Sequence, residues 1–131
     1  MNISLHGRKA HLQLGRFGEN TAVKLLKFKG YRILARNFRL KSGELDIVAL
    51  DGTTVVFIEV KTLRQQKNFA PRSNLSLKQL KRNCVTGKLY LAVFGIPEAR
   101  KRYDLIEVTV ERHAPRRIVS ITHSTDILLQ K

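Results

Sequence analysis

Hydrophobic residues recur along the chain with two periods, one typical of helices and one typical of strands. Residues 14–29 have apolar positions at helical spacing, which predicts an amphipathic helix that ends at Gly30. Its apolar stripe consists of Leu14, Phe17, Thr21, Leu25 and Phe28. Glu19 lies at the edge of that stripe and not on the opposite, solvent-facing side. A second stripe predicts a helix over residues 75–91.

Between and after these helices, apolar residues follow the pattern of β-strands. Strands are predicted over residues 31–40, 44–50, 54–61 and 103–110, with a short edge strand over 116–122 and a final helical turn around 126–129. Asp51-Gly52 is a strong hairpin signal between the second and third strands. Both of those strands are apolar on two faces, which favours central strands covered by helices on each side. The order α-β-β-β-α-β, with the additional edge strand, indicates an α/β domain with a mixed sheet.

Composition limits the class of protein. With 131 residues, 43% of them hydrophobic, we expect one domain spanning residues 1–131, in which the polar and basic residues 1–11 form a flexible arm. No apolar run reaches the roughly 20 residues of a membrane span, and the N-terminus has no continuous apolar core of a signal peptide. With a single cysteine as well, we expect a cytoplasmic protein without a membrane partner.

Charge points to a polyanionic partner. The chain has 25 Lys and Arg against 10 Asp and Glu, a formal net charge of +15, which favours nucleic acid as the partner. Residues 61–102 contain eleven Lys or Arg and one acid. The second helix and the loop before it supply the candidate phosphate contacts: Lys78, Lys81, Arg82, Lys88, Arg64 and Arg72. For the helix residues, a solvated face is the alternative explanation.

The acids of the hairpin stand out against this basic background. If the hairpin loop has two or four residues, either Glu44 or Asp46 lies opposite Glu59. In both registers Glu44, Asp46, Glu59 and Lys61 project from the same face of the sheet, whereas an odd loop would separate them. Like charges facing each other in a sheet are destabilising, and one lysine cannot neutralise three carboxylates.

Two explanations fit this excess of negative charge. One is a structural ion-pair network in which Lys61 and nearby arginines neutralise the acids. The other, which we favour, is a site for Mg²⁺ or Mn²⁺, because hard divalent cations prefer carboxylate oxygens. Such a site suits phosphodiester hydrolysis, in which a metal ion stabilises charge on the phosphate and Lys61 orients or helps to deprotonate the attacking water.

The same residues resemble a known family. The spacing Asp46…Glu59-Val60-Lys61 resembles the signature of the PD-(D/E)XK nucleases, which include restriction enzymes and Holliday-junction resolvases. Over residues 14–110 the chain also resembles the bacterial YraN family of small predicted endonucleases. The matching blocks are GRFGEN (15–20), GYRILARNFR (30–39), GELDIVALDG (43–52), VVFIEVKT (55–62), LKQLKRN…LYL (77–91) and RYDLIEV (102–108).

The resemblance implies a restriction-endonuclease-like fold and assigns roles to five residues. Asp46 and Glu59 would be metal ligands and Lys61 the catalytic lysine, Glu19 would reach into the site from the first helix, and Glu44 matches the acid of the family's GE-(L/I)-D block. The site lysine of the second helix is either Lys78 or Lys81. The segment that follows Lys61 departs from the family's Gly-rich pattern.

The sequence therefore favours a metal-dependent endonuclease. DNA, branched or structured DNA in particular, is favoured over RNA as the substrate, but the sequence does not decide between DNA and RNA. The alternatives are a non-catalytic nucleic-acid-binding protein on the same scaffold and an RNA-binding accessory protein. Symmetric cutting of both strands would call for a two-fold homodimer, with Phe94 and Ile96 as candidate interface residues. Cys84 is expected to be a packed thiol in the apolar stripe of the second helix, and the scattered histidines are not expected to form a metal site. Asp104 is expected to be a turn residue.

Overall fold

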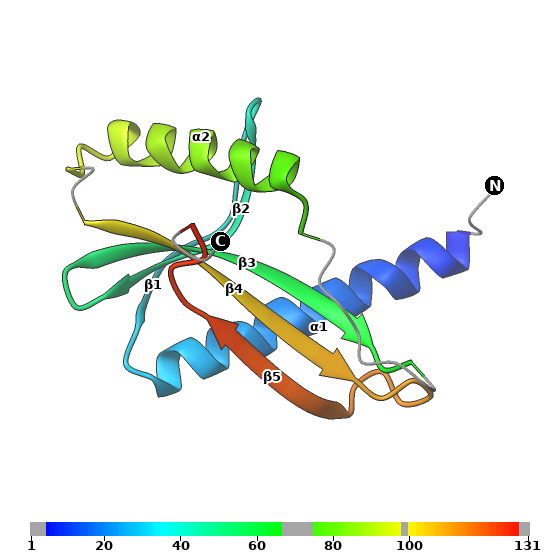
Figure 1. Cartoon of the computed structure of the whole chain (residues 1–131). Helices are drawn as coiled ribbons and strands as arrows, with labels where there is room; N and C mark the ends of the chain where they lie inside the picture. The colour runs from blue at the N-terminus through cyan, green and yellow to red at the C-terminus, as the bar shows by residue number, and fades with distance from the viewer. Residues whose placement is uncertain (1–4, 67–74, 98–99, 129–131) are drawn as a thin grey trace.

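The computed structural model describes residues 5–66, 75–97 and 100–128, which form one five-stranded sheet with a helix on each face (Figure 1). The elements are α1 (Leu5–Phe28), β1 (Arg32–Leu40), β2 (Gly43–Asp51), β3 (Thr54–Arg64), α2 (Leu77–Val93), β4 (Lys101–Val110) and β5 (Ile118–Ser124). The α/β class and the predicted order are confirmed, and the additional edge strand is present as β5.

The strands lie in the sheet in their order along the chain, from β1 to β5. β1, β2 and β3 are joined by short hairpins and pair antiparallel. Because α2 crosses over one face of the sheet before β4 begins, β4 returns parallel to β3, and β5 then pairs antiparallel with β4. β3 is thus the central strand.

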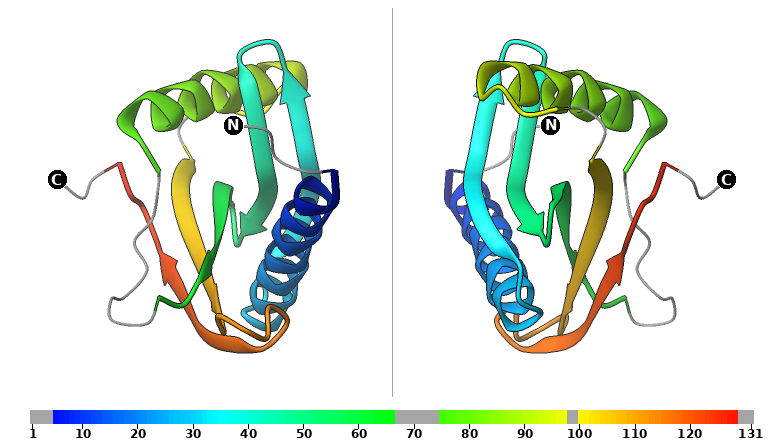
Figure 2. Two further views of the ribbon diagram at one scale, coloured as in Figure 1. Left: turned by 90° about the vertical axis from the view of Figure 1, so that its right-hand side faces the viewer. Right: turned by 90° about the vertical axis from the view of Figure 1, so that its left-hand side faces the viewer.

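The two faces of the sheet carry separate apolar cores, as the two-sided strands predicted. A helix lies over each face (Figure 2). On one face, Ala22 and Leu26 of α1 pack over Ile58 of β3 and its neighbours. On the other face, Tyr90 of α2 packs over Phe57. With helices covering both faces, a polar side chain on β3 lies in the interior unless it projects from an end of the strand.

α1 is longer than the sequence pattern predicted. It begins at Leu5 rather than residue 14, so most of the expected flexible arm is helical and only residues 1–4 of it lie outside the described part of the chain. The first turns show no apolar stripe because they extend past the sheet and residues 9–13 are exposed (Figure 1). The predicted stripe is also corrected at its end: Phe28 is 89% exposed, while Leu26 is fully buried.

The C-terminal prediction differs as well. Residues 127–128 form a turn rather than the start of a helix, and residue 129 lies outside the described residues. The backbone N–H of Ile127 donates to the carbonyl of Tyr103, so this turn is attached to β4.

Candidate active site

The site lies where β2 separates from β3. Their pairing runs from Asp51↔Thr54 to Ile47↔Ile58, which makes a two-residue hairpin loop, one of the two even lengths considered above. β3 continues beside β4 as far as Arg64. Beyond Ile58, the backbone N–H of Val60 donates to Oδ2 of Asp46 at 2.8 Å. The Asp46 carboxylate thus takes the place of a strand carbonyl at the point of divergence.

A cavity of about 400 Å³ opens at this point, and we call it the carboxylate cavity. Its walls include Glu19 from α1, Asp46 from β2, and Glu59 and Lys61 from β3. The structure therefore brings together four of the five residues predicted to form the site. The fifth, Glu44, does not line the cavity and instead forms an ion pair with Arg39 at 3.3 Å.

Both oxygens of the Glu59 carboxylate have partners on α2. Gln79 Nε2 donates to Oε1 at 2.8 Å, and Asn83 Nδ2 donates to Oε2 at 3.1 Å. Lys61 Nζ lies 3.2 Å from Glu59 Oε1 and also donates to Gln79 Oε1 at 3.3 Å. The amide of Gln79 thus bridges the carboxylate and the ammonium group, and fixes their relative positions.

Gln79 and Asn83 were missed by sequence reasoning. Their spacing of four residues places both on one side of a helix, next to the apolar stripe. That polar pair was the available signal, and it lies within a run of basic residues, Lys78, Lys81 and Arg82, whose charge pointed to phosphate contacts instead. The start of the helix helps to orient Gln79, because the side chain of Ser76 accepts a hydrogen bond from the Gln79 backbone N–H at 3.1 Å.

The position of Glu19 depends on a close contact between α1 and β3. A Cβ atom added at Gly18 would lie 1.8 Å from the Thr62 hydroxyl oxygen, so only glycine allows the two backbones to approach this closely. Thr62 follows Lys61 on β3. Gly18 therefore lets α1 present Glu19 to the carboxylate cavity.

Asp46 has no compensating cation among the residues that the structure describes. Burial raises the pKa of Asp46 to about 8, and the negative charge of Glu59 acts in the same direction. The pKa of Glu19 is also raised, first by burial, with Arg36 opposing the effect. The ion-pair network considered above reaches Glu59 and Glu44, through Lys61 and Arg39, but not Asp46. The cavity is short of positive charge.

The donor set fits Mg²⁺ or Mn²⁺. No three His, Cys, Asp or Glu side chains in the described ranges are already gathered as a metal-binding group. Mg²⁺ does not require one, since it is usually held by one or two carboxylates together with water and substrate phosphates. Asp46 and Glu59 supply two carboxylates, and an added cation would favour the ionised form of Asp46.

The predicted phosphate contacts lie on the surface. Lys78, Lys81, Arg82 and Lys88 are exposed on α2, Arg64 is exposed at the end of β3, and Arg72 lies outside the described residues. Neither candidate lysine of the second helix is part of the contacts to Glu59, which α2 makes through Gln79 and Asn83.

Asp104 is not a turn residue, contrary to the prediction. It lies within β4, where it is 1% exposed, and its carboxylate contacts Arg102 at 3.1 Å and His123 Nε2 at 2.8 Å. Lys29 Nζ lies 2.9 Å from His123 Nδ1 and can only donate to it, so Nδ1 is the acceptor. His123 Nε2 therefore carries the hydrogen and donates a hydrogen bond to Asp104. Burial alone would raise the pKa of Asp104, but the hydrogen bonds from His123, Arg102 and the Asp126 N–H lower it. This network connects β4, β5 and the end of α1.

Known proteins with similar sequences come from diverse bacteria. A sequence model of the uncharacterised protein family UPF0102 matches residues 18–108. That segment contains these polar residues around the carboxylate cavity: Glu19, Asp46, Glu59, Lys61, Gln79 and Asn83. A UPF0102 protein of Symbiobacterium thermophilum is 40% identical over 96 residues, which cover 73% of this chain and 81% of that protein. A UPF0102 protein of Geotalea daltonii is 35% identical over 121 residues, covering 92% and 95% of the two chains. Neither described helix has both the length and the apolar composition needed to cross a bilayer.

Proposed function

This chain belongs to the uncharacterised protein family UPF0102, and we propose that it is a divalent-metal-dependent endonuclease that hydrolyses phosphodiester bonds in DNA. UPF0102 is the same family as the YraN family that the sequence resembles. The observation that supports the proposal most directly is the environment of Asp46. Its carboxyl group is held beside Glu59 and Lys61, without a cation of its own among the described residues, in a protein of net charge +15.

Asp46 and Glu59 would hold the metal ion, with Glu19 on the α1 side of the same cavity. When bound, a divalent cation supplies positive charge that stabilises the phosphate as it is attacked. The protein's own contribution is to keep these carboxylates in position: Val60 N–H fixes Asp46, while Gln79 and Asn83 fix Glu59. Prepositioned groups avoid reorganisation during the reaction.

Lys61 would act on the attacking water. Its ammonium group is held between Glu59 Oε1 and Gln79 Oε1, on the wall of the carboxylate cavity, with a side chain that is 23% exposed. There it can orient the water and stabilise the negative charge that develops on the phosphate. Positioned groups that transfer or hold protons typically contribute about 10²- to 10⁴-fold to rate, which sets the loss expected for Lys61→Gln.

The test is cleavage of end-labelled substrates. Single-stranded, duplex, flap and four-way-junction DNA, and matching RNA, would be incubated with Mg²⁺, Mn²⁺ or EDTA. Wild type would be compared with Asp46→Asn and Lys61→Gln. Matched controls are Asp126→Asn, at a position with φ of 54° where asparagine is well tolerated, and Lys24→Gln, an exposed lysine of α1.

Metal-dependent cleavage that is lost in both site variants and kept in both controls is the expected result. Cleavage of junction or flap DNA in preference to plain duplex would support the branched-substrate part of the proposal. Binding without cleavage in either metal, with affinity unchanged or improved in Asp46→Asn, would instead identify a non-catalytic nucleic-acid-binding protein. Cleavage that survives in EDTA would refute the metal-dependent mechanism.

A further inference from the structure

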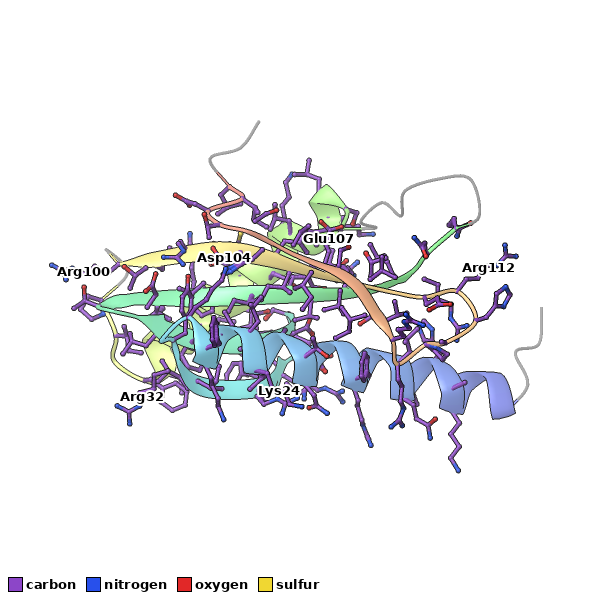
Figure 3. The ribbon with its side chains drawn as sticks, turned by 90° about the horizontal axis from the view of Figure 1, so that it is seen from below. Lys24, Arg32, Arg100, Asp104, Glu107 and Arg112 are labelled. Carbon is purple, nitrogen blue, oxygen red and sulfur yellow. The ribbon has the colours of Figure 1, made fainter. Side chains whose placement is uncertain are left out.

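Three arginines gather at the end of the molecule where β3 and β4 finish, and we call them the arginine cluster: Arg64, Arg112 and Arg116. Arg64 Nη1 donates to the backbone carbonyl of Arg112 at 3.4 Å. Arg64 and Arg116 line a second cavity, of about 90 Å³, together with the N-terminal half of α1. All three side chains are exposed, and Arg112 points away from the sheet (Figure 3).

The arginine cluster is continuous with the carboxylate cavity. Leu14 of α1 lines both cavities. On β3, the residues up to Leu63 line the carboxylate cavity and the next residue, Arg64, lines the second one. Along the backbone of β3, Arg64 lies three residues beyond Lys61, roughly 10 Å at 3.3 Å per residue, and it projects from the same face of the strand as Thr62, which also lines the carboxylate cavity. That distance corresponds to about three base pairs of a duplex at 3.4 Å each.

The cluster has little negative charge to balance it. The acid of the same turn, Glu111, is paired with Arg117 at 3.4 Å. Within the described ranges no carboxylate forms an ion pair with Arg64, Arg112 or Arg116. Gathering like charges without counter-charge is unfavourable for the folded protein and attracts a polyanion.

We propose that the arginine cluster binds the sugar-phosphate backbone of the nucleic acid where it leaves the carboxylate cavity. The inference rests on the proposed function, since it takes the carboxylate cavity as the point of cleavage. The guanidinium group suits this role because its planar fork can donate two hydrogen bonds to one phosphate. The sugar-phosphate backbone then passes over the end of β3, between the β4–β5 turn and the N-terminal half of α1.

The basic face of α2 is the competing surface, and its chemistry fits the role less well. Its lysines alternate with exposed apolar side chains: Leu77 is 68% exposed, Val85 50% and Leu89 43%. Phosphate-binding surfaces are polar and positively charged, whereas exposed apolar side chains on a helix are more typical of contacts with protein. Exposed apolar residues also lie near the arginine cluster, since Ile118 is 41% and Val119 48% exposed, but its cations are all arginines, whose guanidinium groups can bind a phosphate through two hydrogen bonds.

The test measures DNA affinity against salt concentration, in EDTA so that cleavage does not interfere. The Arg64→Gln, Arg112→Gln, Arg116→Gln triple variant would be compared with wild type on short and long duplexes. A matched control, Lys24→Gln, Lys27→Gln, Arg32→Gln, removes the same charge from exposed residues of α1 and β1 (Figure 3 shows Arg32 at the opposite end of the molecule from Arg112). A third variant, with glutamine at Lys78, Lys81 and Lys88, removes it from α2.

Each phosphate contact contributes about −0.9 to the slope of log affinity against log salt, so the cluster variant should lose about 2 to 3 from that slope. Wild type should bind the longer duplex more tightly than the shorter one, whereas the cluster variant should bind the two with similar affinity. The control variant should keep both properties, and lysine at the three cluster positions should largely restore the slope, because the charge is retained. Equal melting temperatures would show that all variants are folded.

A cluster variant that behaves like the control would overturn the inference, as would an α2 variant that accounts for the whole change in slope. These outcomes are distinct from failure of the proposed function. If wild type never cleaves but the cluster variant loses slope, the binding surface stands and the nuclease falls. If wild type cleaves and the cluster variant binds normally, the surface falls and the nuclease stands. Absence of any nucleic-acid binding by wild type would refute both.

Discussion

Replacing Asp46 with asparagine should stabilise the metal-free protein at neutral and alkaline pH. Asparagine keeps an oxygen that accepts from Val60 N–H and an amide that can donate towards Glu59, but it has no charge. In the unfolded chain the Asp46 carboxyl ionises near its ordinary pKa of 3.8, whereas in the folded protein burial and Glu59 raise its pKa to about 8. The folded state therefore binds the extra proton across this window, and stability falls as the pH rises from about 4 to 8.

The size of the effect follows from the same two pKa values. They differ by about 4 units (8 minus 3.8), and each unit corresponds to about 1.4 kcal/mol, so roughly 6 kcal/mol is the upper limit of the loss. Water in the cavity reduces this, and we take about 2 kcal/mol as the smallest effect consistent with a buried carboxylate. At about 3–5 °C per kcal/mol for a chain of this length, that minimum is a difference of about 6–10 °C in melting temperature.

The assay is thermal melting of wild type, Asp46→Asn and the control Asp126→Asn at pH 5, 6.5 and 8, each with EDTA or Mg²⁺. In EDTA, the advantage of Asp46→Asn over wild type should grow by at least about 6 °C between pH 5 and 8. Mg²⁺ at ten times its Kd should stabilise wild type by about 1.4 kcal/mol at pH 8. The effect should be smaller at pH 5, where protons compete for Asp46, and absent in Asp46→Asn.

Two results would refute this reasoning. One is an advantage of Asp46→Asn that does not change between pH 5 and pH 8, which would mean that Asp46 titrates alike in the folded and unfolded chain. The other is an Mg²⁺ effect of the same size in both proteins, which would place the metal ion elsewhere. Asp126→Asn should follow wild type throughout.

Three further predictions concern residues around the site. Gln79→Ala should lower kcat roughly 10- to 100-fold with little change in KM, because Glu59 and Lys61 lose the amide that holds them in place. Lys78→Ala on the same helix should leave kcat unchanged. Equal effects of the two substitutions in a cleavage assay would contradict the bridging role of Gln79. Gly18→Ala should cost about 1–3 kcal/mol in a urea titration through its clash with Thr62, while Gly15→Ala, which meets nothing within 4 Å, should be neutral or stabilising. The lowered pKa of Asp104 means that its carboxylate stabilises the fold above about pH 3.8 and that this stabilisation is lost as the pH falls further. Asp104→Asn should therefore make stability depend less on pH below about pH 4, which acid unfolding followed by circular dichroism would measure.

Most of the fold follows from local pattern. The Asp51-Gly52 hairpin and the two-sided strands led to the correct sheet because both signals depend on residues adjacent in sequence. α1 was predicted too short for a physical reason: its first turns pack against little, so they carry no apolar period. Asp104 was misjudged because one of its partners, His123, comes from another strand, β5, whereas Arg102 lies two residues before it on β4. Only the paired sheet brings His123 opposite Ile106 and within reach of Asp104.

The site was partly predictable for a similar reason. Asp46, Glu59 and Lys61 lie on adjacent strands, so hairpin parity was enough to bring them together. The same even spacing also predicted that Glu44 shares their face, but side chains do not alternate regularly between the two faces along β2. Leu45 and Val48 both face α2, although they are three residues apart, so the strand is irregular near Asp46. Gln79 and Asn83 depend on how α2 lies across the sheet, which no local pattern specifies.

The place where β2 leaves β3 explains why structure and chemistry meet at Asp46. A strand that loses its neighbour leaves a backbone N–H without a carbonyl, and a buried N–H without a partner costs about 1–3 kcal/mol. Asp46 satisfies the N–H of Val60 and, in doing so, directs a carboxylate into the cavity. The two roles are separable. Asp46→Ala removes both the acceptor and the charge, whereas Asp46→Asn removes only the charge. If both variants abolish metal-dependent stabilisation while only alanine destabilises the metal-free protein, the acceptor serves the fold and the charge serves the site.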